Sequence, residues 1–178
     1  LAEKLMEGHA LESSGTRFIS VRFGNVLGSS GSVVPIFERQ IAAGGPVTVR
    51  DAAVTRYFMS IPEAAGLVLC SGMLGENGDR FILEMGEPVK ILDLAEQMIR
   101  FSGKIAGQDI AIEITGLGPG EKQHEKLYAS EEQLEATSHP KIYRVQGGRM
   151  NANAWRHIQD QMALLKPMSD SDAKAWLQ

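Results

Sequence analysis

The chain has 178 residues, of which 43% are apolar and 22% are charged, and its formal net charge is −4. This composition supports a buried core, and the lack of a basic excess excludes a general nucleic-acid-binding role. The single cysteine, Cys70, excludes a disulfide within one chain, and no apolar run reaches the ~18 residues that a membrane span needs. We therefore expect a cytoplasmic chain with no nucleic-acid partner and no membrane contact of its own.

The first eleven residues, LAEKLMEGHAL, have the apolar spacing of a helix, and Gly15 supplies an end to it. No capping residue precedes Leu1, so we expect the chain to be a piece of a longer protein. The next stretch, RFISVRFGNV at 17–26, is rich in β-branched and aromatic residues and is apolar on both faces. This pattern predicts a central strand of a parallel sheet.

A glycine- and serine-rich loop separates this strand from the pattern at 33–43, which has helical spacing and ends in two glycines. Short extended segments are expected after it, at 46–49 and 55–60. A further helix begins at the sequence SIPE, in which Ser60 and Glu63 form a capping box. The predicted buried stripe of this helix consists of Ile61, Ala64, Ala65, Val68 and Leu69.

The second half of the chain continues to alternate between strands and helices. The expected elements are a strand at 80–85, a helix at 91–103, a strand at 110–115, a loop that opens into a short helical stretch at 116–132, a strand at 141–145, and helices at 152–165 and from 169. Units that alternate at these spacings predict an α/β fold with parallel pairing. In such a fold, the first part of the chain completes a sheet and the rest forms a smaller α/β lobe.

The glycine- and serine-rich loop can bring backbone N–H groups close to a phosphate or a sugar. It is not a P-loop, because no G-K-[ST] sequence ends it. Gly24, Gly28 and Gly31, with Asp51 about 20 residues on, resemble a dinucleotide fingerprint, but Pro35 disturbs the expected helix start. A cofactor pyrophosphate site and a structural loop both stay open, and a loop that grips another kind of ligand is favoured.

Two charged positions suit a nucleotide ligand. Arg56 follows a turn-rich segment, and its planar fork can bind a diphosphate or form a surface ion pair. The sequence GLGPGEKQHEKL presents Glu121 and Lys122 on one turn, where a carboxylate can accept ribose hydroxyls and a lysine can neutralise phosphate. A solvated charge pair is the alternative for this turn. The four histidines show no metal-binding spacing.

Three segments taken together resemble one family. RFGNVLGSSGSVVPIFERQIAAGGPVTV, TRYFMSIPEAAGLVL and GLGPGEKQHEKL, with PVKILDLAEQMI between them, are similar to the polysaccharide-biosynthesis nucleotide-sugar 4,6-dehydratases and epimerases of the extended short-chain dehydrogenase/reductase group. The resemblance covers about residues 1–145. It implies the C-terminal portion of a Rossmann-like parallel sheet plus a smaller α/β substrate-binding lobe. The implied division is a remnant of the dinucleotide-binding domain at 1–32, the substrate-binding lobe at 33–150, and C-terminal helices at 151–178.

The resemblance also implies which residues bind ligands. Asn25 would hold the sugar diphosphate, Arg56 would contact it, and Glu121 would bind the ribose. Phe23 would lie near the nicotinamide of the cofactor. The uridine and phosphate pocket would be lined by Ser29, Val33, Val34, Phe37 and Val49.

Two departures from the family pattern stand out. Gly118 lies where the family usually has an arginine, so a cationic contact to the nucleotide is missing or another residue supplies it. The family's cofactor loop and catalytic residues would precede Leu1, and the spacing of Lys4 does not fit the catalytic lysine. We therefore expect no catalytic residue in this chain, NAD or NADP in the longer protein, and no cofactor bound by this segment.

The reaction implied for the longer protein is hydride chemistry on a UDP-sugar such as UDP-GlcNAc, leading to dehydration or epimerisation. This chain would supply the half that grips the UDP-sugar and would be inactive alone. The alternative is a non-catalytic assembly or regulatory module that keeps the fold. In either case we expect a homo-oligomer, because an incomplete sheet would leave an edge without a partner.

Overall fold

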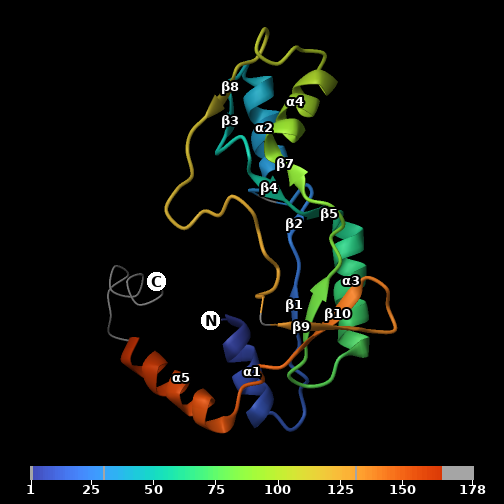
Figure 1. Cartoon of the computed structure of the whole chain (residues 1–178), viewed down its shortest axis with the longest axis vertical. Helices are drawn as coiled ribbons and strands as arrows, with labels where there is room; N and C mark the ends of the chain where they lie inside the picture. Colours follow the sequence, from blue (N-terminus) through green and yellow to red (C-terminus); the bar gives the residue numbers. More distant parts are fainter. Residues whose placement is uncertain (1, 30, 131, 166–178) are drawn as a thin grey trace.

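The computed structural model describes residues 2–29, 31–130 and 132–165 of the chain. Figure 1 shows an elongated molecule, with a helix-flanked sheet at one end of the long axis and a smaller group of helices and strands at the other. We refer to these two parts as the sheet body and the small lobe. The chain passes between them more than once, so neither is one continuous stretch of sequence.

The sheet body is built on a four-stranded sheet. In sheet order, its strands are β1 (Ser20–Arg22), β6 (Arg80–Leu83), β10 (Ile142–Gln146) and β9 (Gln133–Ala136). β1 and β6 run parallel, whereas the other two junctions are antiparallel. The predicted parallel pairing is therefore right for β1 and β6 and wrong for β10, which runs antiparallel to β6. No strand was expected at β9, and it pairs antiparallel with β10 because the connection at 137–141 is too short for a crossover.

The strand predicted at 17–26 differs from the structure in its position. The structure divides this stretch into β1 and β2 (Asn25–Val26), and it places β1 at an edge of the described sheet. All three β1 residues are half-buried, as suits an edge. The short helical stretch predicted within 116–132 is also wrong, because the described residues there form no helix and lead into β9.

Helix α3 (Ile61–Leu74) covers one face of the sheet. The Ser60 hydroxyl accepts a hydrogen bond from the N–H of Glu63 at 3.3 Å, so this residue caps the helix as predicted. The Glu63 carboxylate pairs with the ammonium group of Lys141 beside β10, which ties the start of α3 to the sheet. Apolar side chains fill the space between α3 and the sheet: Met59, Ala64, Leu67, Phe81, Leu83, Met85 and Ile142.

The buried face of α3 differs from the predicted stripe. Ala64 is buried as predicted, but Leu67 and Ser71 complete the buried face. The remaining members of the predicted stripe are exposed: Ile61, Ala65, Val68 and Leu69. Apolar residues occur all round this helix, so their spacing alone could not identify the face that packs.

Two other helices of the sheet body pack on each other, α1 (Ala2–Glu12) and α5 (Ala152–Leu165). They meet at Gly8, where a Cβ would lie 2.0 Å from the ring of Trp155. The indole Nε1 donates to the Glu12 carboxylate at 2.7 Å. The helix predicted at 152–165 is thus confirmed, and the one predicted from residue 169 lies outside the described residues.

A cluster of ion pairs joins α1 to the sheet. Arg22 contacts Glu3 at 2.5 Å and Glu132 at 2.7 Å, and Arg80 contacts Glu7 at 3.0 Å. The side chains of Arg80 and Glu7 are each only 5% exposed. Charges this deeply buried are tolerated only when they are paired, so α1 and the sheet depend on each other in this region.

The small lobe contains two helices and one pair of strands. Its elements are α2 (Val33–Ala42), β3 (Val47–Val49), α4 (Ile91–Phe101) and β8 (Ile112–Ile114). β3 and β8 are parallel, with Val49 opposite Ile114, so the carboxyl ends of both strands lie side by side. The buried core of the lobe consists of Phe37, Ile41, Val47, Val49, Val54, Ile91, Ala95, Ile99 and Ile110.

Two short strand pairs lie where the small lobe meets the sheet body. β2 runs parallel to β5 (Phe58–Met59), and β4 (Thr55–Arg56) runs antiparallel to β7 (Val89–Lys90). The four-stranded sheet of the sheet body pairs β1, which precedes residue 32, with strands that follow it. It therefore crosses the boundary expected at residue 32 between the remnant of the dinucleotide-binding domain and the substrate-binding lobe. Among the described helices, none combines the length and the apolar character that crossing a bilayer requires.

Candidate functional site

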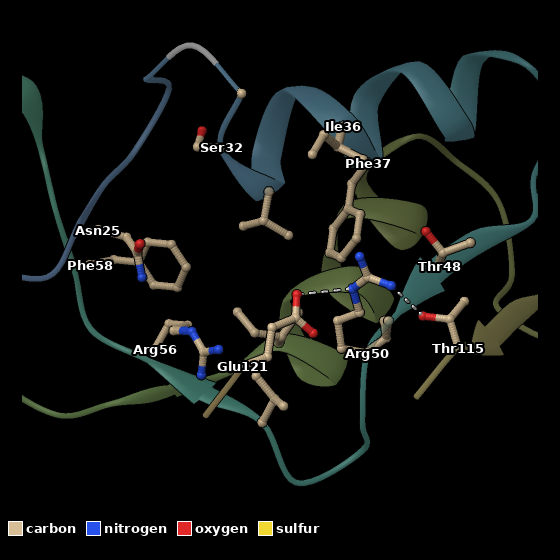
Figure 2. Close-up of a pocket in the computed structure, with 15 residues that line it drawn as sticks. Asn25, Ser32, Ile36, Phe37, Thr48, Arg50, Arg56, Phe58, Thr115 and Glu121 are labelled. Carbon is tan, nitrogen blue, oxygen red and sulfur yellow. Dashed lines mark hydrogen bonds and ion pairs between the residues drawn. The ribbon is translucent and has the colours of Figure 1, made fainter. Parts of the chain in front are cut away.

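A cavity of about 550 Å³ opens where α2, β3, β4 and the loop after β8 come together (Figure 2). It has an apolar wall and a polar rim. The residues that line it are Asn25, Gly31, Ser32, Val33, Ile36, Phe37, Thr48, Val49, Arg50, Val54, Arg56, Phe58, Ile91, Thr115 and Glu121. Side chains from both halves of the chain therefore meet in one hollow.

Helix α2 supplies much of the apolar wall. Val33, Ile36 and Phe37 lie at i, i+3 and i+4, so they share one face of the helix. Phe37 and Val49 are each 1% exposed and belong to the lobe core, which makes this wall rigid. A flat apolar wall of this kind suits a planar ring such as a nucleobase.

The start of α2 lacks the groups that usually satisfy a helix N-terminus. Ser32 occupies the cap position, but its hydroxyl makes no capping bond, and its buried oxygen has no partner among the described residues. No acidic side chain lies in the first turn. The partial positive charge of this helix end is thus left uncompensated beside the cavity.

The carboxyl ends of β3 and β8 place two polar side chains at the rim. Arg50 directly follows β3 and Thr115 directly follows β8, and the guanidinium Nη1 of Arg50 lies 3.4 Å from the Thr115 hydroxyl. Its Nε lies 3.4 Å from a carboxylate oxygen of Glu121. The other Glu121 oxygen accepts the N–H of Gly118 at 2.7 Å. Figure 2 shows the Arg50 guanidinium between Glu121 and Thr115.

Arg56 is held differently from Arg50. Its Nη1 donates to the carbonyls of Thr55 and Gln123, and its Nη2 donates to the carbonyl of Lys122 at 2.8 Å. Its Nε lies 3.3 Å from the Glu125 carboxylate, and the side chain is only 19% exposed. The Arg56 guanidinium therefore fixes the path of the loop that carries Glu121.

Other contacts hold the same loop segment. Gln123 donates to the Asp51 carboxylate at 3.1 Å, and the Thr55 hydroxyl lies 2.9 Å from Nδ1 of His124. The N–H of Ala53 also donates to Asp51 at 2.8 Å, and this hydrogen bond lowers the pKa of the Asp51 carboxyl group. The segment is thus pinned to the β3–β4 connection on one side of Glu121.

Asn25 is fixed through its backbone. Its N–H donates to the carbonyl of Tyr57 at 2.9 Å, within the pair of β2 and β5. Its side-chain amide makes no hydrogen bond to another described residue, so both its donor and its acceptor are available to a ligand. Figure 2 places it beside Phe58 at the edge of the hollow.

The structure brings together six of the nine residues expected at the site. Asn25, Val33, Phe37, Val49, Arg56 and Glu121 all line this one cavity. Three do not line it, and the position of each has a physical reason. Ser29 forms the turn before α2, where its carbonyl accepts the N–H of Ser32. Phe23 packs against the core between α3 and the sheet.

Val34 also lies away from the cavity, because consecutive helical residues point about 100° apart. It lines a separate shallow surface with Met98 and Phe101. Sequence reasoning missed several lining residues, above all Ser32, Arg50 and Thr115. The signal for the last two was their place at the carboxyl ends of the predicted strands, Arg50 directly after the one at 46–49 and Thr115 as the last residue of the one at 110–115, where ligands bind in α/β sheets.

The residues do not form a cradle for a dinucleotide. Gly24 has no free space, because a Cβ there would lie 2.9 Å from the Tyr57 side chain. The next element after β2 is α2 of the small lobe, whereas a dinucleotide-binding unit would return to the sheet. The described residues also contain no group of three or more His, Cys, Asp or Glu side chains that could hold a metal ion.

Comparison with known proteins places the sequence among polysaccharide-synthesis proteins. The family model described as "Polysaccharide biosynthesis protein" matches residues 1–147. The chain is 51% identical over 144 residues to the capsular polysaccharide biosynthesis protein CapD of Staphylococcus aureus, covering 81% of this chain and 24% of CapD. It is 31% identical over 179 residues to the UDP-glucose 4-epimerase of Rickettsia typhi, covering 98% of this chain and 51% of that enzyme.

Solved structures show the same fold. Pen from Bacillus thuringiensis matches with a TM-score of 0.71 and 33% identity, over 91% of this chain and 54% of Pen. A more distant match is a Methanobrevibacter ruminantium UDP-N-acetylglucosamine 4-epimerase in complex with UDP-N-acetylmuramic acid, with a TM-score of 0.55 and 21% identity over 71% of this chain and 42% of that one. Another is a Bacillus anthracis dTDP-glucose 4,6-dehydratase in complex with NAD, with a TM-score of 0.52 and 16% identity over 64% of this chain and 36% of that one.

The chain spans about a quarter of the length of CapD and about half of the lengths of the Rickettsia typhi epimerase and of Pen. The α/β architecture expected from the sequence is confirmed by these matches. The resemblance noted from the three sequence segments is confirmed as well. The relatives of this chain include a UDP-glucose 4-epimerase, and the chain belongs to the polysaccharide biosynthesis protein family.

Proposed function

We propose that this chain is the substrate-binding part of an NAD- or NADP-dependent UDP-sugar 4,6-dehydratase or epimerase that acts in surface polysaccharide synthesis in the cytoplasm. The observation that carries the proposal is the cavity itself, which joins an apolar wall to a rim with an amide, a carboxylate and two guanidinium groups. A nucleoside diphosphate sugar needs this combination of surfaces. Its base is flat and apolar on its faces, its diphosphate is anionic, and its sugars carry hydroxyl groups.

Each part of the ligand has a matching surface. The uracil ring would lie against Val33 and Phe37, and the ribose hydroxyls would donate to the Glu121 carboxylate. The diphosphate would lie near the uncompensated start of α2, where helix N-termini bind anions. The Asn25 amide would contact the diphosphate and its linked sugar at the side facing the sheet body.

The work of this chain in the reaction would be orientation. Held at both ends, the sugar would be presented in one pose to reacting groups that lie outside this chain. Such positioning lowers the activation barrier, because the reactants are already oriented. The nicotinamide cofactor would supply the hydride acceptor and donor. Since the described residues form no dinucleotide cradle, no residue of this chain is assigned to it.

A titration of the full chain with UDP, UDP-GlcNAc and AMP tests the binding proposal. We expect UDP and UDP-GlcNAc to bind with one site per chain and AMP to bind at least tenfold more weakly, where about 1.4 kcal/mol corresponds to that factor. Asn25→Ala should weaken UDP-GlcNAc binding without lowering the melting temperature. Absence of binding of either uridine nucleotide at millimolar concentration would overturn the proposal.

A second candidate function is non-catalytic assembly with another copy of this chain. The outward face of α3 favours it, since Leu69 is 71% exposed and Met73 is 76% exposed. Glu63 is the one charged residue in this helix. The outward face is therefore uncharged, and another copy of the chain would have to contact it through apolar side chains. Sedimentation of the full chain and of Leu69→Glu distinguishes the outcomes: a dimer that the substitution abolishes supports assembly, and a monomer in both cases refutes it.

A further inference from the structure

We infer that Arg50 binds the diphosphate of the ligand, and that Glu121 is its exchangeable counter-ion when no ligand is bound. This inference rests on the proposed uridine-nucleotide site and assigns its cation. Arg50 was not among the residues expected from the sequence. Three observations on the described residues carry the assignment, and each concerns a different side chain of the cavity rim.

The first observation is that Arg56 has little left to offer an anion. A guanidinium has five N–H groups, and four contacts, to three backbone carbonyls and to the Glu125 carboxylate, leave Arg56 a single N–H on Nη2. To bind a phosphate with two N–H groups, Arg56 would have to release one of the contacts that hold the loop carrying Glu121. Its geometry is that of a structural clamp on the segment at 122–125.

The second observation is that Arg50 is held loosely and lies in the open. Its side chain is 59% exposed, and its two contacts, to Glu121 and Thr115, are both 3.4 Å long. Hydrogen bonds of this type are usually near 2.9 Å, and exposed ion pairs contribute little to stability. Its remaining terminal nitrogen, Nη2, has no partner among the described residues. A ligand phosphate could therefore take over this guanidinium at small cost.

The third observation concerns Gly118, which stands where the family usually has an arginine. A Cβ built on Gly118 would lie 3.5 Å from the Glu121 carboxylate. The Arg50 guanidinium lies 3.4 Å from the opposite oxygen of that same carboxylate. Residues 118 and 50 thus neighbour the same carboxylate, so Arg50 supplies a positive charge beside the position where the sequence resemblance implies an arginine.

The exchange of partners is chemically simple. In the ligand-free chain, Glu121 keeps one oxygen on the Gly118 N–H and the other on Arg50. When the nucleotide enters, the Arg50 fork turns to the diphosphate, for which its planar geometry is suited. The released Glu121 oxygen is then free to accept from the ribose. No proton has to move, because both side chains keep their charges.

The discriminating measurement is the ratio of the uridine Kd to the UDP Kd, measured on the full chain by calorimetry. This ratio isolates the contribution of the diphosphate. Arg50→Gln should lower it about tenfold, the loss expected for one charge-assisted hydrogen bond at a partly exposed site, and should not weaken the binding of uridine, which carries no phosphate. Arg39→Gln is the matched control, because Arg39 is exposed on α2 and lines no part of the cavity.

A rescue variant makes the test independent of folding. Gly118 does not have a positive φ, and its Cβ position is at ordinary contact distance, so Gly118→Arg is compatible with the backbone. Added to Arg50→Gln, it should restore the ratio to within about threefold of the unsubstituted chain. A variant that is merely misfolded would not be rescued by this second substitution.

The outcomes separate the inference from the function on which it rests. If UDP binds and Arg50→Gln leaves the ratio unchanged, the assignment of Arg50 is wrong while the uridine-nucleotide site stands. If Arg50→Gln weakens uridine and UDP equally, Arg50 contacts the nucleoside and the assignment is again wrong. If neither ligand binds the unsubstituted chain, the proposed function and the inference fall together.

Discussion

Arg56 and Lys122, far apart in the sequence, are joined by a hydrogen bond of 2.8 Å from the guanidinium Nη2 to the backbone carbonyl. Together with the bond to the Gln123 carbonyl, it fixes the loop at the point where Glu121 enters the cavity. An arginine that binds carbonyls in this way acts on the ligand through the loop. Its removal should affect the loop before it affects any charge in the site.

Arg56→Lys should therefore behave almost like Arg56→Ala. A lysine keeps the charge but cannot reach two successive carbonyls with a planar fork. We expect backbone amide hydrogen exchange over residues 120–126 to accelerate at least tenfold in both variants. If Arg56→Lys kept the protection of the unsubstituted chain, charge alone would explain the role of this residue.

Substitution of Glu121 should alter selectivity for the ribose. In the proposed site, the Glu121 carboxylate accepts from ribose hydroxyls, so Glu121→Gln should bind UDP and 2′,3′-dideoxy-UDP with similar affinity. The unsubstituted chain should prefer UDP by about tenfold, the ratio for one hydrogen bond to a charged group. Competitive titration of the two nucleotides measures this. A preference that persists in Glu121→Gln would place the ribose elsewhere.

The ion-pair cluster under α1 should make stability depend on pH. Hydrogen bonds from Arg22 lower the pKa of Glu3 and of Glu132 from the usual value of 4.5. A carboxyl group whose folded pKa is depressed stabilises the fold above its unfolded pKa and loses this effect as the pH falls through the folded pKa. Urea midpoints should thus be flat above about pH 5.5 and fall as the pH drops below 4.5.

Arg22→Met is the variant for that experiment. Without the guanidinium, the two carboxylates lose the largest cause of their depressed pKa values and keep only Arg80 as a cationic partner, so the acid-induced loss of stability should be smaller than in the unsubstituted chain. At neutral pH, the variant should be less stable by about 1–3 kcal/mol, the cost of hydrogen bonds lost by part-buried charged groups. An unchanged slope of stability against pH would show that other groups control acid unfolding.

Two glycines in helices should respond to alanine in opposite directions. Gly8→Ala drives a methyl group into the Trp155 ring and should destabilise the chain by about 1–3 kcal/mol, as overpacking does. Gly66→Ala is the control, because a Cβ there meets nothing within 4 Å, and it should stabilise α3 by about 0.5–1 kcal/mol. Thermal melts of both variants test the pair. A shift in the same direction would contradict the packing of α1 on α5.

Local sequence patterns predicted the helices and strands well where short-range features alone determine the structure. The spacing of Val33, Phe37 and Ile41 identified α2, and the sequence SIPE identified the start of α3. The packed face of α3 could not be predicted, because Leu67 and Leu69 are equally apolar and tertiary contacts alone distinguish them. Strand β9 was missed because it has only four residues, Gln133–Ala136, and so short an alternation of polar and apolar side chains does not identify a strand.

The site was predicted in part. The resemblance supplied Asn25, Arg56 and Glu121, which the structure places on one cavity. Arg50 was missed, since its meaning depends on β3 and β8 lying side by side, and that pairing joins residues more than sixty positions apart. Arg50 and Gly118 both lie next to the Glu121 carboxylate, and this proximity in space cannot be predicted from their spacing in the sequence.

The run of chain at 20–26 pairs with β6 in the sheet body and then, two residues later, with β5 beside the small lobe. Gly24 lies between these pairings, against Tyr57 with no room for a side chain. Because this contact restrains β2 against β5, we expect the cleft to have its width before any ligand arrives. Capture of the nucleotide should then follow second-order kinetics up to high concentration, without the plateau in rate that a preceding domain rotation would impose.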